Sequence, residues 1–348
     1  MKRKIVVTGG TGYIGSHTSV ELINEGFDVV ILDNLYNSEA EVTDRIQTIT
    51  GIKPALEIID ICDKPRLEQF FAKNRDIAAI IHFAAYKAVS ESVSKPLNYY
   101  YNNLVSLINL LDLMKRFNVP DIVFSSSCTV YGQPEKLPVT EDAPLQPATS
   151  PYGNTKQVGE EIIRDATFAE KSIKAIALRY FNPIGAHPSG LIGELPRGVP
   201  ENLVPFITQT AYGLRDELKV FGNDYDTPDG SCIRDYLHVV DLAKAHVVAV
   251  KRLLEGKNKK NFEVFNLGTG NGVTVLEAIS SFERVSGVKL KYRITDRRPG
   301  DIEKIWADPT FANQELGWKT KSTLDEAMKT AWEWEKKIRS KKEQPSGK

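Results

Sequence analysis

The sequence predicts an α/β protein with a doubly wound parallel sheet and a smaller mixed α/β lobe after it. Three observations support this prediction. Short β-branched runs alternate with amphipathic helical segments through the first half of the chain, and a glycine-rich turn follows the first run. Polar residues gather after several of these runs, where open parallel sheets bind their ligands. The functional residues are therefore expected along one edge of the sheet.

The first expected element is a strand, which leads through a glycine turn into a helix. The run Lys4-Ile5-Val6-Val7-Thr8 is β-branched, and an amphipathic pattern continues after the turn to Glu25. Glycines at 9, 12 and 15 allow a tight turn, a close approach to a pyrophosphate and close packing of the helix on the sheet. The spacing Gly10-x-Gly12-x-x-Gly15 also fits the general dinucleotide fingerprint in its required context. This stretch predicts a Rossmann-type fold.

The second expected strand, Phe27 to Leu32, ends in Asp33, eighteen residues after Gly15. A carboxylate at this place accepts hydrogen bonds from the adenosine ribose hydroxyls and repels a 2′-phosphate. Asn34 follows it in place of an arginine. The sequence therefore favours NAD over NADP, although an aspartate that merely ends a strand is common.

The alternation of strands and helices continues to the middle of the chain. Strands are expected over 55–59, 78–83 and 121–126, and helices over 65–73 and 97–117. Each of these strands is followed by residues suited to ligand contact, namely Asp60-Ile61, Phe83-Ala84-Ala85-Tyr86-Lys87 and Ser125-Ser126-Ser127.

A helix expected over Tyr152 to Glu170 carries Tyr152 and Lys156 one turn apart on one face. A neighbouring ammonium lowers the pKa of a phenol and favours the phenolate, so the pair can form a base. The spacing alone is weak, because a surface tyrosine beside a solvated lysine is the commoner case. Ser127, after the preceding strand, could donate to a substrate oxygen beside the phenol, or could be satisfied by turn backbone.

The chain changes character after Phe181. A strand over 173–180 ends the first lobe, and proline and glycine become frequent from about 183 to 235. We expect a first lobe over 1–181, to which a segment near 236–275 returns, and a substrate lobe over 182–340, with helices beginning near Asp241 and over 275–285. The end of the chain from Lys336 to Lys348 is polar and basic, and we expect it to be disordered. The domain division assigns 341–348 to this disordered tail.

Arg234 and Arg298 in the second lobe are candidate clamps for a substrate diphosphate, because a guanidinium binds phosphate oxygens in a bidentate manner. For each residue taken alone, an ordinary surface arginine is the commoner case.

Composition excludes several classes of protein. The 45 lysines and arginines balance 45 aspartates and glutamates, so nucleic acid and membrane are not expected partners. No stretch approaches the length of a membrane span. The three cysteines, Cys62, Cys128 and Cys232, are far apart, which suits a reduced cytoplasmic protein, and the histidines show no metal-ligand spacing.

Taken together in this order, the motifs resemble the extended short-chain dehydrogenase/reductase family. Within it, the chain is similar to the UDP-glucose 4-epimerases along nearly its whole length. The stretches that carry this closer resemblance are "VTGGTGYIGSHT", "LDNLYNS", "HFAAYKAVSESVSKPL", "FSSSCTVYG", "SPYGNTK", "RYFNPIGAHPSG", "IRDYLHVVDLA", "NLGTG" and "RRPGD".

The resemblance implies NAD-dependent 4-epimerisation of a UDP-hexose in galactose metabolism. Phenolate Tyr152 takes the 4′-hydroxyl proton as hydride leaves C4′, and the 4-keto sugar then turns and accepts hydride on its other face. Ser127 binds the 4′-oxygen, and Lys156 holds the nicotinamide ribose and lowers the pKa of Tyr152. The family also implies a homodimer, paired through helices such as those over 97–117 and 152–170.

The resemblance extends to the binding residues. The cofactor positions it implies are Gly9, Gly12, Tyr13, Ile14, Gly15, Asp33, Asn34, Asn37, Ser38, Asp60, Ile61, Phe83, Ala84, Lys87, Asn102, Tyr152, Lys156 and Tyr180. The substrate positions it implies are Lys87, Ser127, Tyr152, Tyr180, Asn182, Asn202, Leu203, Phe221, Arg234, Tyr236, Arg298, Asp301 and Ile305.

One position departs from the family pattern. Several members carry a tyrosine shortly after the last "GD", near the sugar 2-substituent, where this chain has Ile305. Isoleucine is smaller, so some activity on UDP-N-acetylhexosamines is a hypothesis.

Two alternatives remain beside the epimerase interpretation. A sugar-nucleotide 4,6-dehydratase on the same fold needs an Asp-Glu pair after the fifth strand, where this chain has Ser127-Cys128-Thr129. A non-catalytic dinucleotide-binding protein could keep the fold, but would have no reason to keep Tyr152, Lys156 and Ser127 together.

Overall fold

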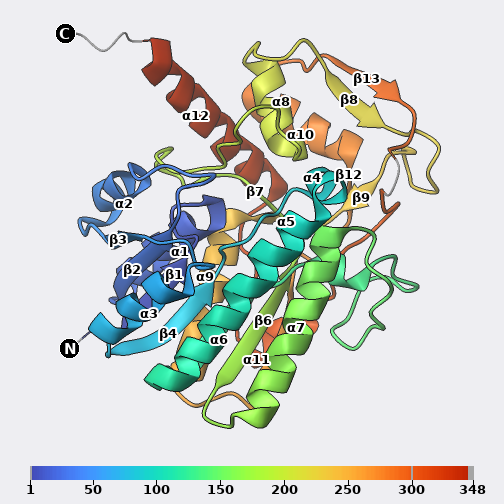
Figure 1. Ribbon diagram of the computed structural model, residues 1–348. Coiled ribbons are helices and arrows are strands. Elements are labelled where there is room, and N and C mark those ends of the chain that lie inside the picture. The colour runs from blue at the N-terminus through green and yellow to red at the C-terminus, as the bar shows by residue number, and fades with distance from the viewer. Residues whose placement is uncertain (1, 299–300, 344–348) are drawn as a thin grey trace.

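The computed structural model describes residues 2–298 and 301–343, which form two lobes (Figure 1). The larger lobe is built around one sheet with helices on both faces, and the smaller lobe lies beyond one end of the strands. In the part of the chain described, no helix is long and apolar enough to cross a lipid bilayer.

The central sheet has seven strands in the order β11-β6-β5-β4-β1-β2-β3, and every neighbouring pair is parallel. The order reverses direction between β1 and β4, which is the point where open α/β sheets bind their ligands. The strands are β1 (Lys4–Thr8), β2 (Asp28–Asp33), β3 (Ala55–Ile58), β4 (Ile77–His82), β5 (Asp121–Ser125), β6 (Lys174–Tyr180) and β11 (Phe262–Leu267).

Alternate residues of these strands enter two separate cores. In β1, Ile5 and Val7 pack on one face of the sheet, and Val6 packs on the other. The first face is covered by α1 (Tyr13–Asn24), α2 (Val42–Thr50) and α9 (Val239–Leu254). The second is covered by α3 (Lys64–Lys73), α6 (Ser106–Phe117) and α7 (Pro151–Ala169). Burial on both faces explains why the strands read as continuous apolar runs.

Helix α7 begins where its sequence provides a start signal. The Ser150 hydroxyl accepts a hydrogen bond from the Gly153 amide at 3.1 Å, and Pro151 occupies the first helical position, where its missing N–H costs nothing. This start places Tyr152 in the first turn, beside the end of β5.

The long helix expected over 97–117 is present, but it is not uniform. It consists of α5 (Pro96–Tyr100), a π-helical turn (Tyr101–Val105) and α6, and a short α4 (Val89–Ser94) precedes it. Figure 1 shows α5 and α6 running beside α7 across the sheet.

The smaller lobe has its own hydrophobic core. Its helices are α8 (Leu203–Ala211), α10 (Val275–Ser286) and α12 (Leu324–Glu343), which share a core with β8 (Leu218–Phe221). Strand β13 (Tyr292–Thr295) pairs with β8 in parallel. Two small sheets lie near the lobe boundary: β7 (Asn182–Ile184) pairs with β10 (Tyr236–His238), and β9 (Ile233–Arg234) with β12 (Val273–Thr274).

The segment expected to return to the first lobe does so, because β11 pairs with β6 and α9 covers the first face. The expected disordered end is wrong as far as Glu343. Helix α12 continues to that residue, and Trp332 and Trp334, which are buried in the preceding part of the helix, hold it against the small lobe. Residues 344–348 lie outside the described residues. Helix α11 (Thr310–Glu315) lies between the small lobe's β13 and α12 in the chain, and its Ala312 packs in the core on the first face of the sheet.

Candidate active site

The expected catalytic residues meet at the carboxyl end of β5. Tyr152 and Lys156 come from the first turns of α7, and Ser127 follows the strand as the cap of a 3-10 helix (Cys128–Tyr131). All three are buried, with exposed fractions of 8%, 4% and 7%. They form one cluster because α7 lies against the strand that delivers the serine.

Hydrogen bonds fix this cluster to the strand end. The Lys156 ammonium donates to the Ser125 carbonyl at 2.7 Å, and the hydroxyls of Ser125 and Tyr180 lie 2.5 Å apart. The ammonium lies 4.9 Å from the ring centroid of Phe124 and 5.8 Å from that of Tyr152. The lysine is therefore held by backbone beside the phenol, and does not pair with it directly.

Burial controls the titration of the pair. It raises the pKa of Tyr152 well above its usual range, and a hydrogen bond with Ser127 lowers that pKa only in part. Burial also lowers the pKa of Lys156 to about 8, and the nearby Glu160 carboxylate opposes this shift. Burial is the largest influence on the pKa of Tyr152, and Lys156 is not among the groups that shift it in this arrangement, so the lowering of this pKa by Lys156 stays a prediction.

The glycine turn has the features that a dinucleotide needs. A side chain at Gly15 would come within 2.3 Å of the Gly9 carbonyl oxygen, and one at Gly9 within 2.8 Å of the Ala84 amide nitrogen, so both are required by packing. Gly12 is different, because a Cβ there would meet only the Gly9 oxygen, at 3.1 Å. Gly12 also starts α1 without a side-chain cap, which leaves the helix N-terminus to a ligand. The residues present therefore fit a bound dinucleotide, with Tyr13 and Ile14 in the first helical turn.

The Asp33 carboxylate ends β2 beside this turn. It accepts hydrogen bonds from the Thr11 amide at 3.1 Å, the Leu35 amide at 2.9 Å and the Ser38 hydroxyl at 3.1 Å. These contacts fix the carboxylate where a ribose would lie. Asn37 precedes Ser38 in the same loop.

The other expected cofactor residues line neighbouring strand ends. Asn34 donates to the Asp60 carboxylate at 3.2 Å, and Ile61 is buried after it. Phe83 and Ala84 follow β4, and Asn102 lies in the π-helical turn, where it donates to Asn103 at 3.0 Å. The Tyr13 hydroxyl donates to the Gly185 carbonyl at 2.6 Å and so reaches the second lobe.

Lys87 and Asn202 both donate to Glu194, which no motif of the sequence points to. The Glu194 carboxylate accepts from the Lys87 ammonium at 2.9 Å and from the Asn202 amide at 2.6 Å. These two candidates come from different lobes. No local sequence signal identifies Glu194, because its partners lie far away or across a loop.

Arg234, Arg298 and Asp301 form a second cluster, in the small lobe. Arg298 donates to Asp301 at 2.7 Å, and an Arg234 nitrogen lies 3.8 Å from the same carboxylate. The Arg298 guanidinium also lies over the Phe221 ring, 5.4 Å from its centroid. The structure therefore brings four expected substrate residues together.

The remaining substrate candidates lie around the lobe boundary. The Asn182 side-chain oxygen is buried without a hydrogen-bond partner, which suits a ligand contact. Tyr236 is buried, and Leu203 begins α8. Ile305 has an exposed fraction of 2% and packs in a small apolar cluster with Tyr131, Phe181 and other side chains.

Further residues of the site were not expected from the sequence. Arg197 donates to the carbonyls of Tyr36 and Ser38 at 2.7 and 2.6 Å, which joins the second lobe to the Asp33 loop. Glu160 and Arg179 form a buried ion pair behind the catalytic cluster. The sequence does contain a signal for Glu160, because Glu160 follows Lys156 by four residues and so lies on the same face of the helix. The sequence contains no such signal for Arg197.

The comparisons with known proteins agree with this geometry. A family model described as GDP-mannose 4,6 dehydratase matches residues 6–331. A UDP-glucose 4-epimerase of Bacillus subtilis is 52% identical, over 95% of this chain and 96% of its own length. The crystal structure of the UDP-glucose 4-epimerase from Bifidobacterium longum in complex with NAD+ and UDP is 47% identical, with a TM-score of 0.92, and covers 97% of this chain and 99% of that one.

A third relative is named for two sugars. The UDP-Glc/GlcNAc 4-epimerase of Campylobacter jejuni is 36% identical, with a TM-score of 0.83, over 96% of this chain and 99% of that one. The dehydratase description of the family model and the epimerase names differ in activity. Ser127-Cys128-Thr129 lacks the carboxylates that elimination of water needs, which favours the epimerase names over the dehydratase description.

Proposed function

The chain belongs to the UDP-glucose 4-epimerase family, and from that premise we propose that it interconverts UDP-glucose and UDP-galactose by NAD-dependent epimerisation at C4′. The observation that carries the proposal is the meeting of Tyr152, Ser127 and Lys156 at the end of β5, beside a turn that fits a dinucleotide. This arrangement joins a proton acceptor and a cation at one edge of the sheet.

The protein's own residues handle the proton. Tyr152 accepts it from the sugar 4′-hydroxyl and returns it to the 4-keto oxygen after the sugar has turned, so both protonation states of the phenol are used. Ser127 would hold the 4′-oxygen, and the Lys156 ammonium would stabilise the phenolate and hold the nicotinamide ribose. When bound, NAD supplies the acceptor and donor of the C4′ hydride. The raised pKa of Tyr152 makes its phenolate a stronger base for the first proton transfer, and the phenolate then needs the nearby Lys156 ammonium to stabilise it.

The glycine turn, Asp33 and the strand-end residues would hold NAD. Gly12 would leave room for the pyrophosphate, and Asp33, which the Thr11 amide holds in place, would accept the hydroxyls of the adenosine ribose. We assign NAD binding to 1–181 with the returning segment near 236–275, and UDP-sugar binding to 182–340. The pairing of β11 with β6 supports this division.

Arg234 and Arg298 would bind the UDP diphosphate. Both guanidinium groups lie beside the Asp301 carboxylate. A bound diphosphate would offer them negatively charged oxygens in addition to this carboxylate. Asn182 would offer its unpartnered oxygen to the ligand. Few charges face the hexose in this scheme, which lets the keto sugar turn.

We also propose a homodimer formed through the helices over 97–117 and 152–170. Leu97, Tyr101, Ile108 and Phe168 expose 79%, 63%, 48% and 76% of their surface along this part of the chain. Exposed apolar side chains on these neighbouring helices suit pairing with a second copy. Leu97→Asp should convert the dimer to a monomer in sedimentation, whereas Ile294→Asp, on β13, should not. An unchanged dimer in Leu97→Asp would overturn this interface.

The free thiols of Cys62, Cys128 and Cys232 support a cytoplasmic location, and the substrate pair places the reaction in galactose metabolism. A second substrate class, the UDP-N-acetylhexosamines, is proposed from Ile305. The two-sugar name of the Campylobacter jejuni relative supports it.

The proposed function is tested with the purified protein. We expect it to convert UDP-galactose to UDP-glucose without added cofactor, and to release NAD on denaturation. Conversion of the sugar nucleotide to a 4-keto-6-deoxy product would support a dehydratase. Released NAD without any conversion would support a non-catalytic dinucleotide-binding protein.

A further inference from the structure

Helix α7 carries a third polar residue on its catalytic face. Tyr152, Lys156 and Glu160 follow one another at intervals of four residues, so they lie one above the other along one side of the helix. Glu160 has an exposed fraction of 0%. A fully buried carboxylate is rare and needs a compensating partner.

The Glu160 carboxylate has three donors. The Ser126 hydroxyl donates to one oxygen at 2.6 Å, and Arg179 donates to both oxygens, through Nε at 2.9 Å and an NH2 nitrogen at 2.6 Å. Both oxygens are therefore engaged. The carboxylate joins α7 to β5 through the serine and to β6 through the arginine.

Ser126 occupies a central place in this arrangement. Ser125, before it, accepts the Lys156 ammonium on its carbonyl, and Ser127, after it, hydrogen-bonds the Tyr152 phenol. A movement of Ser126 would therefore change both contacts at once.

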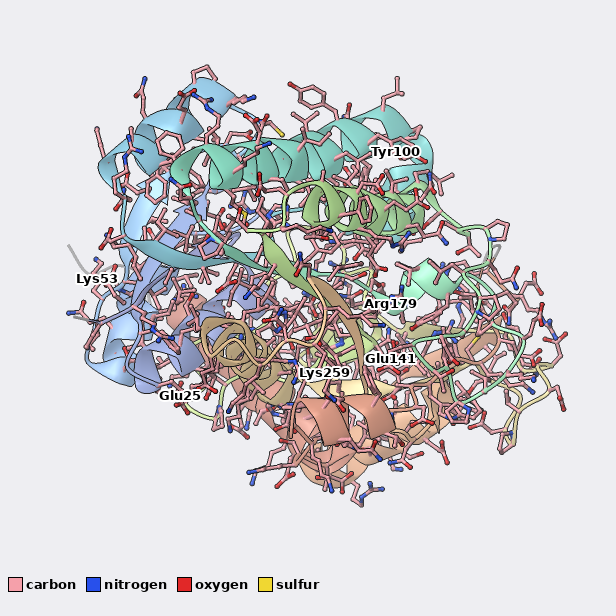
Figure 2. The ribbon with its side chains drawn as sticks, turned by 90° about the horizontal axis from the view of Figure 1, so that it is seen from below. Glu25, Lys53, Tyr100, Glu141, Arg179 and Lys259 are labelled. Carbon is pink, nitrogen blue, oxygen red and sulfur yellow. The ribbon has the colours of Figure 1, made fainter. Side chains whose placement is uncertain are left out.

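The far side of the arginine is also fixed. Arg179 donates to the Tyr131 hydroxyl at 2.9 Å and to the Glu141 carbonyl at 3.4 Å, and Tyr131 donates to Asn266 at 2.6 Å. Figure 2 labels Arg179 and Glu141, which the second of these contacts joins. The guanidinium cannot turn away from Glu160 without breaking this network.

We propose that Glu160 is a positioning residue for the epimerisation. Its carboxylate holds the Ser125-Ser126-Ser127 end of β5 against α7, and so sets the places of Ser127 and the Lys156 ammonium relative to the Tyr152 phenol. The inference rests on the proposed function for the reaction it serves. A buried ion pair often adds little stability over apolar residues of the same volume, which is consistent with a role in placement.

The same carboxylate also affects the charge of Lys156. Burial lowers the pKa of Lys156 to about 8, and Glu160 raises it. The other groups near the ammonium are the Ser125 carbonyl on β5, His82 on β4, and Tyr152 and Tyr180. Burial keeps His82 neutral, with a pKa of about 3, and raises the pKa of Tyr180 to about 12. Among these groups, Glu160 carries the negative charge, and Arg179 beyond it carries the opposing positive charge.

Glu160→Gln tests the inference, because the amide keeps the size of the side chain and an acceptor for Ser126 but removes the charge. We expect kcat for UDP-galactose to fall roughly 10- to 100-fold, with KM nearly unchanged, since misplaced groups affect the chemical step. An ammonium is charged below its pKa, so loss of the carboxylate should move the fall of kcat at high pH to lower pH. Titration of the lysines, labelled with ¹³C at Cε, by NMR measures the pKa of Lys156 directly.

The matched control is Glu263→Gln. Glu263 accepts from Arg252 at 2.7 and 2.9 Å and is also buried, but it joins α9 to β11. This variant should lose thermal stability as Glu160→Gln does, and keep the kcat, the pH profile and the pKa of Lys156 of the unmodified protein.

The outcomes separate the inference from the proposed function. If Glu160→Gln matches Glu263→Gln in kcat and in the pKa of Lys156, the positioning role is wrong. If Glu160→Gln does not fold, Ser126→Ala decides: it cuts the link to β5 and leaves the ion pair, so a reduced kcat supports the role and an unchanged kcat overturns it. An unmodified protein that converts neither UDP-hexose overturns the proposed function instead.

Discussion

The catalytic end of α7 and the arginine cluster of the small lobe differ in how they are held. Tyr152, Ser127 and Lys156 are buried on a helix and a strand end, and their contacts are to fixed backbone and side chains. Arg298 has a side chain that is 45% exposed, and it pairs with Asp301 three residues away. The proposed function assigns the chemistry to the buried edge of the sheet, and diphosphate binding to segments whose charges satisfy one another locally.

This difference predicts that changes at the two regions affect different kinetic constants. Loss of a group at the sheet edge should lower kcat, because that group acts in the transition state. Loss of a group in the arginine cluster should raise KM, because that group binds substrate and transition state alike.

The largest expected effect is that of Tyr152→Phe. Removal of the hydroxyl should lower kcat by roughly 10²- to 10⁴-fold, because proton transfer at the 4′-oxygen is lost, and bound NAD should remain. The measurement is the conversion of UDP-galactose, with NAD quantified after denaturation.

Tyr100→Phe is the matched control for this loss of a hydroxyl. The Tyr100 hydroxyl, on α5, accepts a hydrogen bond at 2.8 Å from Asn154, which lies on α7 as Tyr152 does. Figure 2 shows Tyr100 away from Arg179. A kcat in Tyr152→Phe equal to that in Tyr100→Phe would remove the phenol from the mechanism.

The next effect is expected in the arginine cluster. Arg298→Ala should raise KM for UDP-galactose by about 10- to 100-fold with little change in kcat, since a charge-assisted hydrogen bond contributes about 1.5–3 kcal/mol. Arg297→Ala is the control, because Arg297 pairs with Asp224 at 2.7 Å and lies over Tyr225. Equal KM values in the two variants would contradict the clamp.

The pH dependence of kcat tests the buried lysine. Lys156 has a pKa lowered to about 8 by burial, and the ammonium form exists below that value. Activity should therefore fall as pH rises above about 8, by roughly tenfold per pH unit if the ammonium is essential. A kcat that stays constant to about pH 10 would show that the charge of Lys156 is not needed.

The smallest effect is expected at Ile305. Ile305→Tyr should lower the turnover of UDP-N-acetylglucosamine relative to UDP-glucose by about tenfold, because a larger side chain takes room beside the 2-substituent. Turnover of UDP-glucose in the same variant controls for disturbance of the apolar cluster around residue 305. An unchanged ratio, or no N-acetyl turnover in the unmodified protein, would contradict the hypothesis.

The same comparison explains what the sequence could predict. The strands, the glycine turn and the Tyr152–Lys156 spacing depend on residues close together in the chain, and the structure contains each of them. The contacts of Glu194 with Lys87 and of Arg197 with Tyr36 join residues 107 and 161 positions apart, for which local patterns carry no signal. The polar residues at the end of the chain suggest disorder, but α12 runs to Glu343. The buried side chains of Trp332 and Trp334 bind this helix to the small lobe.

The pKa of Tyr152 depends on features that the sequence spacing does not show. The spacing placed an ammonium near the phenol correctly, but it could not show that the Ser125 carbonyl would hold that ammonium or that both groups would be buried. Burial depends on how β4, β5, β6 and α7 assemble, which no single stretch of the chain determines.

The central claim is that the C4′ hydrogen leaves and returns as hydride while Tyr152 handles only the hydroxyl proton. UDP-galactose deuterated at C4′ tests it most directly, with the product examined by mass spectrometry after conversion in ordinary water. The account predicts UDP-glucose that keeps the deuterium at C4′, because a transferred hydride does not exchange with solvent. Loss of the deuterium to water would contradict it, since it would mean that a base removes the C4′ hydrogen as a proton.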